Sequence, residues 1–229
     1  MREKPILFSA PMVRAILAGD KTQTRRIVKL PHNNPLGKWE PTTFGGPNGG
    51  RTRKGKTIPL HTAIWHTRTG DSIGAQWVVS DRLWVREAWY CDDYRVQSGP
   101  YIKPDDMNVA EAQNDGTLIY RASSGDRPYE AEQPVWRPSI HMPRWASRIT
   151  LEVAGVRVER LQDISYEDAL AEGVPDHRSM IESECAEGET ADQLARRLRW
   201  PQREYQNLWN AINGPGSWDL NPWVALQTA

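Results

Sequence analysis

Residues 149–161 read ITLEVAGVRVERL and alternate apolar and polar side chains more regularly than any other stretch of the chain. Apolar residues occupy every second position from Ile149 to Val153, and the pattern resumes at Val156 after a bend predicted at Gly155. Period-two alternation is typical of a strand with one face in a core and the other toward solvent. We therefore expect a sheet built around this segment.

Shorter predicted elements flank this strand. A helix is expected to begin at Pro11, because a missing N–H costs nothing in the first helical turn, and to end at Gly19. Ser165 is a predicted N-cap of a short helix that Gly173 ends. The remaining predictions are strands at 5–9, from residue 20, within 71–90, at 118–123 and at 221–227, and helices at 190–200 and 201–212. Many short strands with a few helices predict an α+β fold with a small curved sheet or barrel.

Three segments between these elements are expected to be loop insertions. They cover about 31–60, 92–117 and 175–190. The first is rich in glycine and proline and contains the basic cluster RTRKGK at 51–56. Long loops inside a domain are uncommon and are often functional.

The charge of the chain is balanced overall but unevenly distributed. The 229 residues carry 29 Lys and Arg and 29 Asp and Glu, yet residues 1–60 hold twelve basic residues against three acidic ones. A basic N-terminal quarter can attract a polyanion such as nucleic acid, or it can be a solvated loop with no partner. The 11 tryptophans against 2 phenylalanines are a second unusual feature, because the indole N–H needs a hydrogen-bond partner and tryptophans often line half-wet grooves.

The sequence excludes several classes of protein. No apolar run approaches the roughly 20 residues of a membrane-spanning helix, and the first residues lack the apolar core of a secretory signal. Two cysteines without a CxxC motif argue against a disulfide framework, so a cytoplasmic location is expected. No P-loop, GxGxxG or GxSxG motif is present, and four of the five histidines, all but His141, lie in loop-like sequence without ligand spacing. We expect neither a metal nor another cofactor.

Several segments together resemble ASCH-domain proteins, in particular the larger members encoded by phages and prophages. The matching segments follow one order along nearly the whole chain: ILFSAPMVRAILAGDKTQTRR (6–26), DRLWVREAW (81–89), WRPSIHMPRWASRITLEVAGVRVERLQDIS (136–165), ALAEG (169–173) and LWNAINGPGSWDLNPWV (208–224). The resemblance implies one ASCH domain over residues 1–229, with a small PUA-like β-barrel and flanking helices. It also implies a bacterial host cytoplasm if the protein is phage-encoded.

The resemblance also implies a catalytic set. Some smaller bacterial ASCH proteins are N4-acetylcytidine amidohydrolases, and their motif G-x-K-T-x-T-x-R matches the segment from Gly19 to Arg26. In that group the Lys and the second Thr act in catalysis, which points to Lys21 and Thr24 here, and counting through the following segment places the catalytic Glu at Glu172. Thr24 would be the nucleophile, Lys21 its base, and Glu172 would orient the substrate or protonate the leaving group. An ideal strand would point Lys21 and Thr24 to opposite faces, so this role requires a bend.

Other residues are candidates for binding substrate or nucleic acid. Arg86 and Glu87 are consecutive in a predicted strand, so one of them must face inward and needs a partner or a ligand. A dense polar and aromatic cluster follows at 136–145, either lining a cleft or closing the barrel. The expected binding residues are Arg25, Arg26, Arg86, Glu87, Trp136, Arg137, Ser139, His141, Arg144, Trp145 and Trp218.

Three functions follow as alternatives. The first is an amidohydrolase that removes the acyl group from an N4-acetylcytidine-type base. The second is a non-catalytic module that binds RNA or DNA, and the third is a ribonuclease. The expected partner in each case is a modified nucleoside or RNA, or DNA for the second, and not a membrane.

Overall fold

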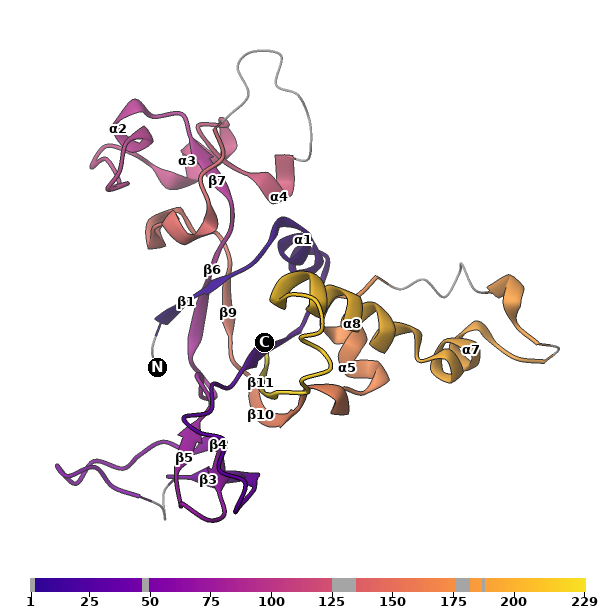
Figure 1. Ribbon diagram of the computed structural model, residues 1–229. Coiled ribbons are helices and arrows are strands. Elements are labelled where there is room, and N and C mark those ends of the chain that lie inside the picture. Colours follow the sequence, from indigo (N-terminus) through magenta and orange to yellow (C-terminus); the bar gives the residue numbers. More distant parts are fainter. Residues whose placement is uncertain (1–2, 47–49, 125–134, 176–181, 187) are drawn as a thin grey trace. The chain divides into compact units, whose positions relative to one another are not determined.

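A computed structural model describes residues 3–46, 50–124, 135–175, 182–186 and 188–229 (Figure 1). The chain divides into two compact units. Unit 1 comprises residues 1–19 and 80–152, and unit 2 comprises residues 20–79 and 153–229. The chain therefore passes from one unit to the other three times.

Unit 1 contains a three-stranded sheet and a two-stranded sheet. In the first, β6 (Arg82–Arg86) lies between β1 (Glu3–Leu7), which is parallel to it, and β9 (Thr150–Glu152), which is antiparallel. In the second, β7 (Trp89–Cys91) pairs with β8 (Leu118–Tyr120). The helices are α1 (Ala10–Ala18), α2 (Tyr94–Gln97), α3 (Val109–Asn114) and α4 (Arg121–Ser124), with 3₁₀ turns at Ser139–His141 and Arg144–Ala146.

The start and end of α1 follow the sequence signals. Pro11 occupies the first helical turn, where no amide is needed. Gly19 ends the helix in the left-handed conformation, with a φ of 83°, and its N–H bonds to the last carbonyls. A buried cluster around Trp89, Cys91 and Met142 forms a core of unit 1.

Unit 2 contains two three-stranded antiparallel sheets. In one, β11 (Trp223–Thr228) lies between β10 (Gly155–Arg160) and β2 (Gln23–Ile27). In the other, β4 (His61–His66) lies between β3 (Trp39–Phe44) and β5 (Ser72–Gly74). The helices are α5 (Tyr166–Ala171), α7 (Ala191–Leu198) and α8 (Trp200–Asn213), with 3₁₀ turns at Leu161–Asp163 and Glu182–Glu184.

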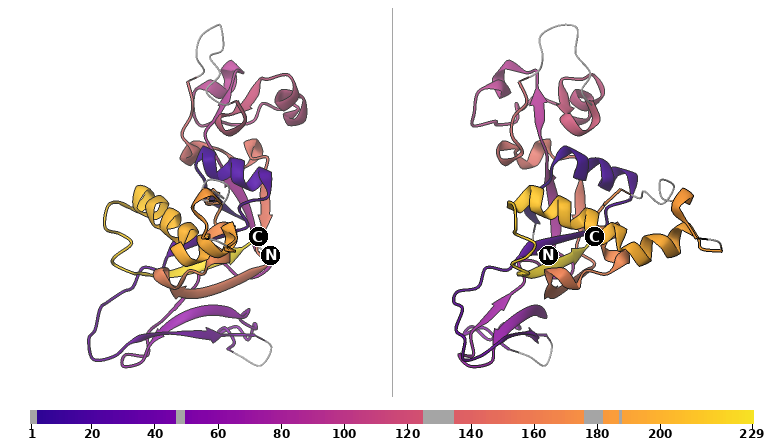
Figure 2. Two further views of the ribbon diagram at one scale, coloured as in Figure 1. Left: turned by 90° about the vertical axis from the view of Figure 1, so that its right-hand side faces the viewer. Right: turned by 45° about the vertical axis from the view of Figure 1, so that its right-hand side comes forward.

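The β10–β11–β2 sheet is covered on both faces. Val158 and Ala225, which are register partners, share a cluster with Ile64 of β4 and with Ala75, which follows β5. Val224, the next residue along β11, packs instead in a cluster with α5 and α8 residues. Successive residues of a strand point to opposite faces, so β11 is buried on both sides. Figure 2 shows α8 on one side of this sheet and β3–β5 on the other.

The mixed α+β class is confirmed, but no barrel closes among the described strands, whose pairings form open sheets. Residues 149–161, expected as one bent strand, form β9 and β10, which belong to different sheets and different units. The expected final strand is β11, and the expected N-cap Ser165 accepts a hydrogen bond from Asp168 N.

The expected loop insertions contain regular structure. Segment 31–60 includes β3, and its basic part forms a hairpin in which Arg51 pairs with Thr57. Segment 92–117 includes α2 and α3. Segment 175–190 includes a 3₁₀ turn at Glu182–Glu184, and residues 176–181 and 187 lie outside the described residues. The assignment of residues 1–229 to a single ASCH domain stays a prediction.

Candidate functional site

Lys21 and Glu172, which are 151 positions apart, form a buried ion pair in unit 2. Lys21 lies just before β2 and Glu172 is the C-cap of α5, and the two form an isolated antiparallel bridge. The neighbouring Thr22 N–H donates to Ala171 O at 2.8 Å. The backbone contacts therefore hold Lys21 and Glu172 side by side independently of the ion pair between their side chains.

The Lys21 ammonium is enclosed by acceptors. Its Nζ donates to Glu172 Oε2 at 2.8 Å, to Glu172 O at 2.8 Å and to Gln23 O at 2.7 Å. Its side chain is 2% exposed. Burial lowers the pKa of Lys21 below its usual value, while the charge and hydrogen bond of Glu172 oppose that change. A lysine with a lowered pKa can exchange a proton with a neighbouring carboxylate.

Thr24 lies in β2 and is buried. Within the described residues, its side chain forms no hydrogen bond to Lys21 or to Glu172. Its register partner on β11 is Gln227, whereas Arg25 pairs with Leu226. Thr24 and Arg25 therefore point to opposite faces of the sheet. The Gln23 carbonyl that Lys21 contacts belongs to the peptide that joins Gln23 to Thr24, so the ammonium lies beside the Thr24 backbone.

Arg25 connects Glu172 to two further carboxylates. Its Nη1 donates to Glu172 Oε1 at 3.0 Å, and its Nη2 donates to Asp168 Oδ2 at 3.0 Å. Its Nε and Nη2 both donate to Glu159 Oε1, at 2.9 and 2.7 Å. The Arg25 side chain is fully buried. Arg157 also pairs with Glu159 and Asp168, so basic and acidic groups alternate through this cluster.

Tyr205 of α8 lies against the same cluster. The Arg25 guanidinium carbon is 5.9 Å from the centroid of the Tyr205 ring. Burial raises the pKa of Tyr205 well above its usual value, and the charge and hydrogen bond of Glu172 add to the effect. Tyr205 therefore stays a neutral donor toward the Glu172 carboxylate. Glu159, Asp168 and Tyr205 were not among the residues expected from sequence.

Two further expected residues of unit 2 lie near this cluster. Arg26 is half-buried, and burial lowers its pKa while the charge of Glu172 opposes that change. Trp218 is 8% exposed and packs edge-on against Tyr205, with 6.2 Å between ring centroids. The structure gives Trp218 a packing role, and its role in binding stays a prediction.

Arg86 and Glu87 were predicted to point to opposite faces of a strand. In unit 1, Glu87 is the one that faces inward. It is 1% exposed and binds Arg148 through both carboxylate oxygens, at 2.8 and 3.0 Å. Arg86 is half-buried, with its guanidinium over the Trp84 ring and donating to Ile140 O. The charge of Glu87 is thus already paired within the protein.

The cluster at 136–145 divides between packing and surface positions. Trp145 packs on the core of unit 1 and donates from Nε1 to Tyr101 O at 2.9 Å. Arg137 lies over the Tyr101 ring, and Arg144 pairs with Glu3. The other three differ in exposure: Trp136 and Ser139 are half-buried, and His141 is exposed.

Known proteins offer no guide to this arrangement, because no family model, curated protein or solved structure matches the chain. Within the described ranges, no helix combines the length and apolar character needed to traverse a bilayer. The same residues contain no group of three or more His, Cys, Asp or Glu side chains placed to hold a metal ion.

Proposed function

We propose that this chain is an ASCH-domain, PUA-like protein that binds a modified cytidine and hydrolyses its N4-acyl amide. The observation that carries the proposal is the buried contact between Lys21 Nζ and Glu172 Oε2 at 2.8 Å. These are two of the three residues that the resemblance implies act in catalysis, and nothing in their spacing along the chain requires them to meet. A buried lysine whose pKa is lowered, as it is for Lys21, is common at functional sites.

The proposed reaction consumes one water and gives cytidine and a carboxylic acid. Lys21 passes a proton to Glu172 and, as a neutral amine, accepts the hydroxyl proton of Thr24 while Thr24 Oγ1 attacks the acyl carbon. The bond from the acyl carbon to N4 breaks, and Glu172 donates its proton to the departing N4. Lys21 then passes its proton to Glu172 again and, as a neutral amine, takes a proton from the water that attacks the acyl-threonine ester. Glu172 donates its proton to the departing Thr24 Oγ1, which releases the acid and restores Thr24.

The step from the observed geometry to attack requires Thr24 Oγ1 to reach the acyl carbon beside Lys21. Strand alternation points Thr24 away from the Arg25 face, while the Gln23–Thr24 peptide lies at the Lys21 ammonium. β2 is an outer strand of its sheet, so a substrate would approach along its edge, and the side chains that bury Lys21 and Thr24 would have to move for it to contact both groups.

Release of cytidine from N4-acetylcytidine, measured by chromatography without added metal, tests the proposal. We expect Lys21→Ala to lower the rate by about 10²-fold or more, as for loss of a general base. Thr24→Ala should also be inactive, and Thr24→Ser should retain activity because it keeps the hydroxyl. Lys29→Ala removes an exposed lysine two residues beyond β2 and is the matched control. An active Lys21→Ala variant would reject this mechanism.

One observation favours a non-catalytic nucleic-acid-binding module as a second candidate. Lys21 Nζ donates to Gln23 O and to two oxygens of Glu172, and Thr24 bonds to neither Lys21 nor Glu172 within the described residues. If the chain only binds nucleic acid, the charged cluster around Lys21 serves to stabilise unit 2. Binding of RNA without hydrolysis of any acylated cytosine would support this candidate over the amidohydrolase. Cleavage of the RNA itself would instead indicate the ribonuclease.

A further inference from the structure

A cleft of about 770 Å³ opens in unit 1, separate from the residues of the Lys21 cluster. Its described walls come from the end of β1, the first turns of α1, α4 and the turn at Ser139. A volume of this size is within the range of small-molecule sites, which is roughly 300–1,000 Å³. The lining residues are Phe8, Ser9, Ala10, Pro11, Arg14, Ala88, Arg121, Ala122, Ser123, Pro138 and Ser139.

The charge of this cleft is positive. Arg14 and Arg121 both line it, and no described lining residue is acidic. Neither guanidinium forms an ion pair with a residue that the structure describes, whereas four of the eight described arginines of unit 1 do, namely Arg82, Arg95, Arg144 and Arg148. Two unneutralised guanidinium groups at one cleft favour an anion.

The other polar groups of the cleft are donors that suit the same ligand. Ser9, Ser123 and Ser139 supply hydroxyls. Ser9 is the N-cap of α1, but its side chain makes no hydrogen bond to the helix. The first amide of α1 that donates a helical hydrogen bond is Val13 N, which bonds to Ser9 O at 3.0 Å. The amides of Ala10 and Met12 therefore precede the helical ladder, at the positive end of the helix dipole.

The rest of the wall is apolar and small. Phe8 and Ala122 are buried, and Ala10, Ala88, Pro11 and Pro138 present little side-chain bulk. α1 and α4, which carry the two arginines, contact each other within unit 1 (Figure 1). An anion bound between them would leave room beside it for an uncharged group.

We propose that this cleft is a phosphate-binding site that takes the phosphate of a nucleotide, with the sugar over the alanine and proline wall. Arg14 and Arg121 would form charge-assisted hydrogen bonds to the phosphate oxygens, and Ser9 and Ser139 would donate to the remaining ones. This site does not depend on hydrolysis at Lys21, because the two sets of residues belong to different units.

Isothermal titration with cytidine 5′-monophosphate and with cytidine tests the site. We expect the wild type to bind the monophosphate at least about tenfold more tightly than the nucleoside, because charged hydrogen bonds supply the affinity. Equal affinity of the two would overturn the proposal. A short single-stranded RNA in the same titration distinguishes a polymer from a mononucleotide, and its binding supports the site only if the variants below reduce it.

A pair of substitutions at Ser9 separates charge from folding. Asp and Asn are as favourable at an N-cap as Ser, so Ser9→Asp and Ser9→Asn should melt at the temperature of the wild type. Ser9→Asp places a carboxylate in the cleft and should weaken binding of the monophosphate by about tenfold or more, while Ser9→Asn, which exchanges the Ser9 hydroxyl for an uncharged amide donor, should weaken it much less than Ser9→Asp does. Equal affinity of these two variants would contradict the proposal.

A second variant removes the attraction instead. Arg14 and Arg121 are exposed, so the double substitution Arg14→Gln with Arg121→Gln should fold normally and bind the monophosphate at least about tenfold less tightly. Arg203→Gln, at an exposed position of α8, is the control and should bind as the wild type does. A double variant with wild-type affinity would overturn the assignment.

Discussion

Glu172 is the residue on which the buried charges of unit 2 depend. It accepts hydrogen bonds from Lys21 and from Arg25, whose side chains are 2% and 0% exposed. Glu172→Gln keeps the shape but removes the charge that both cations face. We expect it to lower the free energy of unfolding by about 3–5 kcal/mol, as when one partner of a buried pair is lost. Urea denaturation followed by tryptophan fluorescence measures the change.

Glu167→Gln is the matched control, since Glu167 lies on the same helix and its pair with Arg196 is exposed. Exposed pairs contribute little to stability, so this variant should unfold close to the wild-type midpoint. If the two variants unfolded at the same urea concentration, Glu172 would not neutralise the cluster.

Tyr205 and Tyr120 should resist ionisation in alkali. Burial raises the pKa of Tyr205 well above 10, and burial raises the pKa of Tyr120 to about 12. In the unfolded chain both ionise near pH 10, so the folded state binds more protons above that pH and its stability falls as the pH rises. Absorbance at 295 nm should show that these two tyrosines ionise only well above pH 10 while the protein stays folded.

Tyr205→Phe checks the assignment, because it should remove one of these two late-titrating groups. A variant with the same number of late groups as the wild type would show that Tyr205 ionises with the exposed tyrosines.

The pairing of Lys21 with Glu172 could be anticipated only through the resemblance, because no local pattern connects positions so far apart. The partners of Arg25 were missed for a physical reason. Glu159 alternates with Val158 in a strand, and the polar face of such a strand is normally expected to face solvent. Here α5 and α8 cover that face, so its charges are buried and paired with one another.

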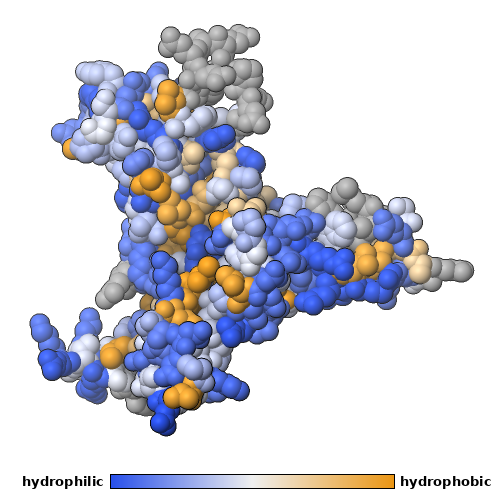
Figure 3. Space-filling view, in the orientation of Figure 1, coloured by the Kyte–Doolittle hydropathy of each residue, from blue (hydrophilic) through white to orange (hydrophobic). Residues whose placement is uncertain are grey.

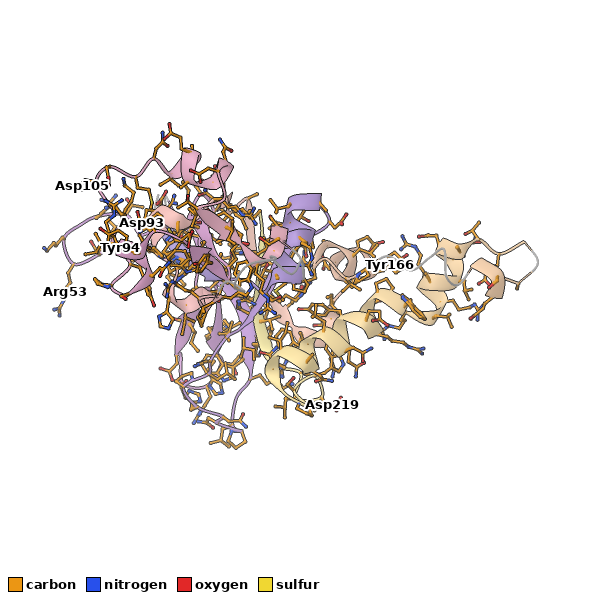
Figure 4. The ribbon with its side chains drawn as sticks, turned by 90° about the horizontal axis from the view of Figure 1, so that it is seen from above. Arg53, Asp93, Tyr94, Asp105, Tyr166 and Asp219 are labelled. Carbon is orange, nitrogen blue, oxygen red and sulfur yellow. The ribbon has the colours of Figure 1, made fainter. Side chains whose placement is uncertain are left out.

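At the scale of elements, the hairpin at 50–58 carries four basic side chains on exposed backbone. Thr52 N bonds to Lys56 O at 2.8 Å and Ile58 N bonds to Gly50 O at 3.0 Å. Arg53 points away from the ribbon in Figure 4, and this region is hydrophilic in Figure 3. Replacing Arg51, Arg53, Lys54 and Lys56 with Ala should weaken RNA binding and flatten its salt slope by roughly one unit per lost phosphate contact.

A quadruple variant of the exposed residues Lys29, Lys38, Arg68 and Arg203 removes the same charge from other surfaces of unit 2. Anisotropy titrations of RNA at several salt concentrations should give this control a slope near that of the wild type. Superimposable curves for the wild type and the hairpin variant would show that the hairpin does not contribute to RNA binding and serves only to increase solubility. Hydrolysis of free N4-acetylcytidine should be unchanged in both.

The elements show what a periodic pattern can and cannot predict. Alternation in 149–161 correctly indicated strand conformation. Alternation shows which residues share a face of a strand, but it does not identify the neighbouring strand. The segment expected as one strand therefore forms two strands, β9 and β10, in different sheets. β3 was missed because Pro41 and the glycines after Phe44 are typical of loops. Proline is tolerated there because β3 is an outer strand.

At the scale of the molecule, each unit has its own buried core and its own cysteine. Cys91 is fully buried in unit 1, where burial raises the pKa of its thiol, while Cys185 in unit 2 is half-buried. We expect a thiol reagent to label Cys185 in the native protein and Cys91 only when unit 1 unfolds. Mass spectrometry after timed labelling in increasing urea gives the two rates separately.

The substitution Cys185→Ser isolates the Cys91 signal, and Cys91→Ser provides the opposite control. Rapid labelling of Cys91 in the absence of urea would contradict the packing of unit 1.

The position of β11 between β10 and β2 has a consequence for synthesis. Residues 23–27 leave the ribosome early, but their sheet partner is residues 223–228, about two hundred positions later. At roughly 5–20 residues per second, the β2 segment with its arginines waits on the order of ten seconds or longer for the strand that completes its sheet. Until then the nascent chain presents an unpaired basic segment, and a ribosome that stops short of Trp223 leaves a product whose central strand was never made.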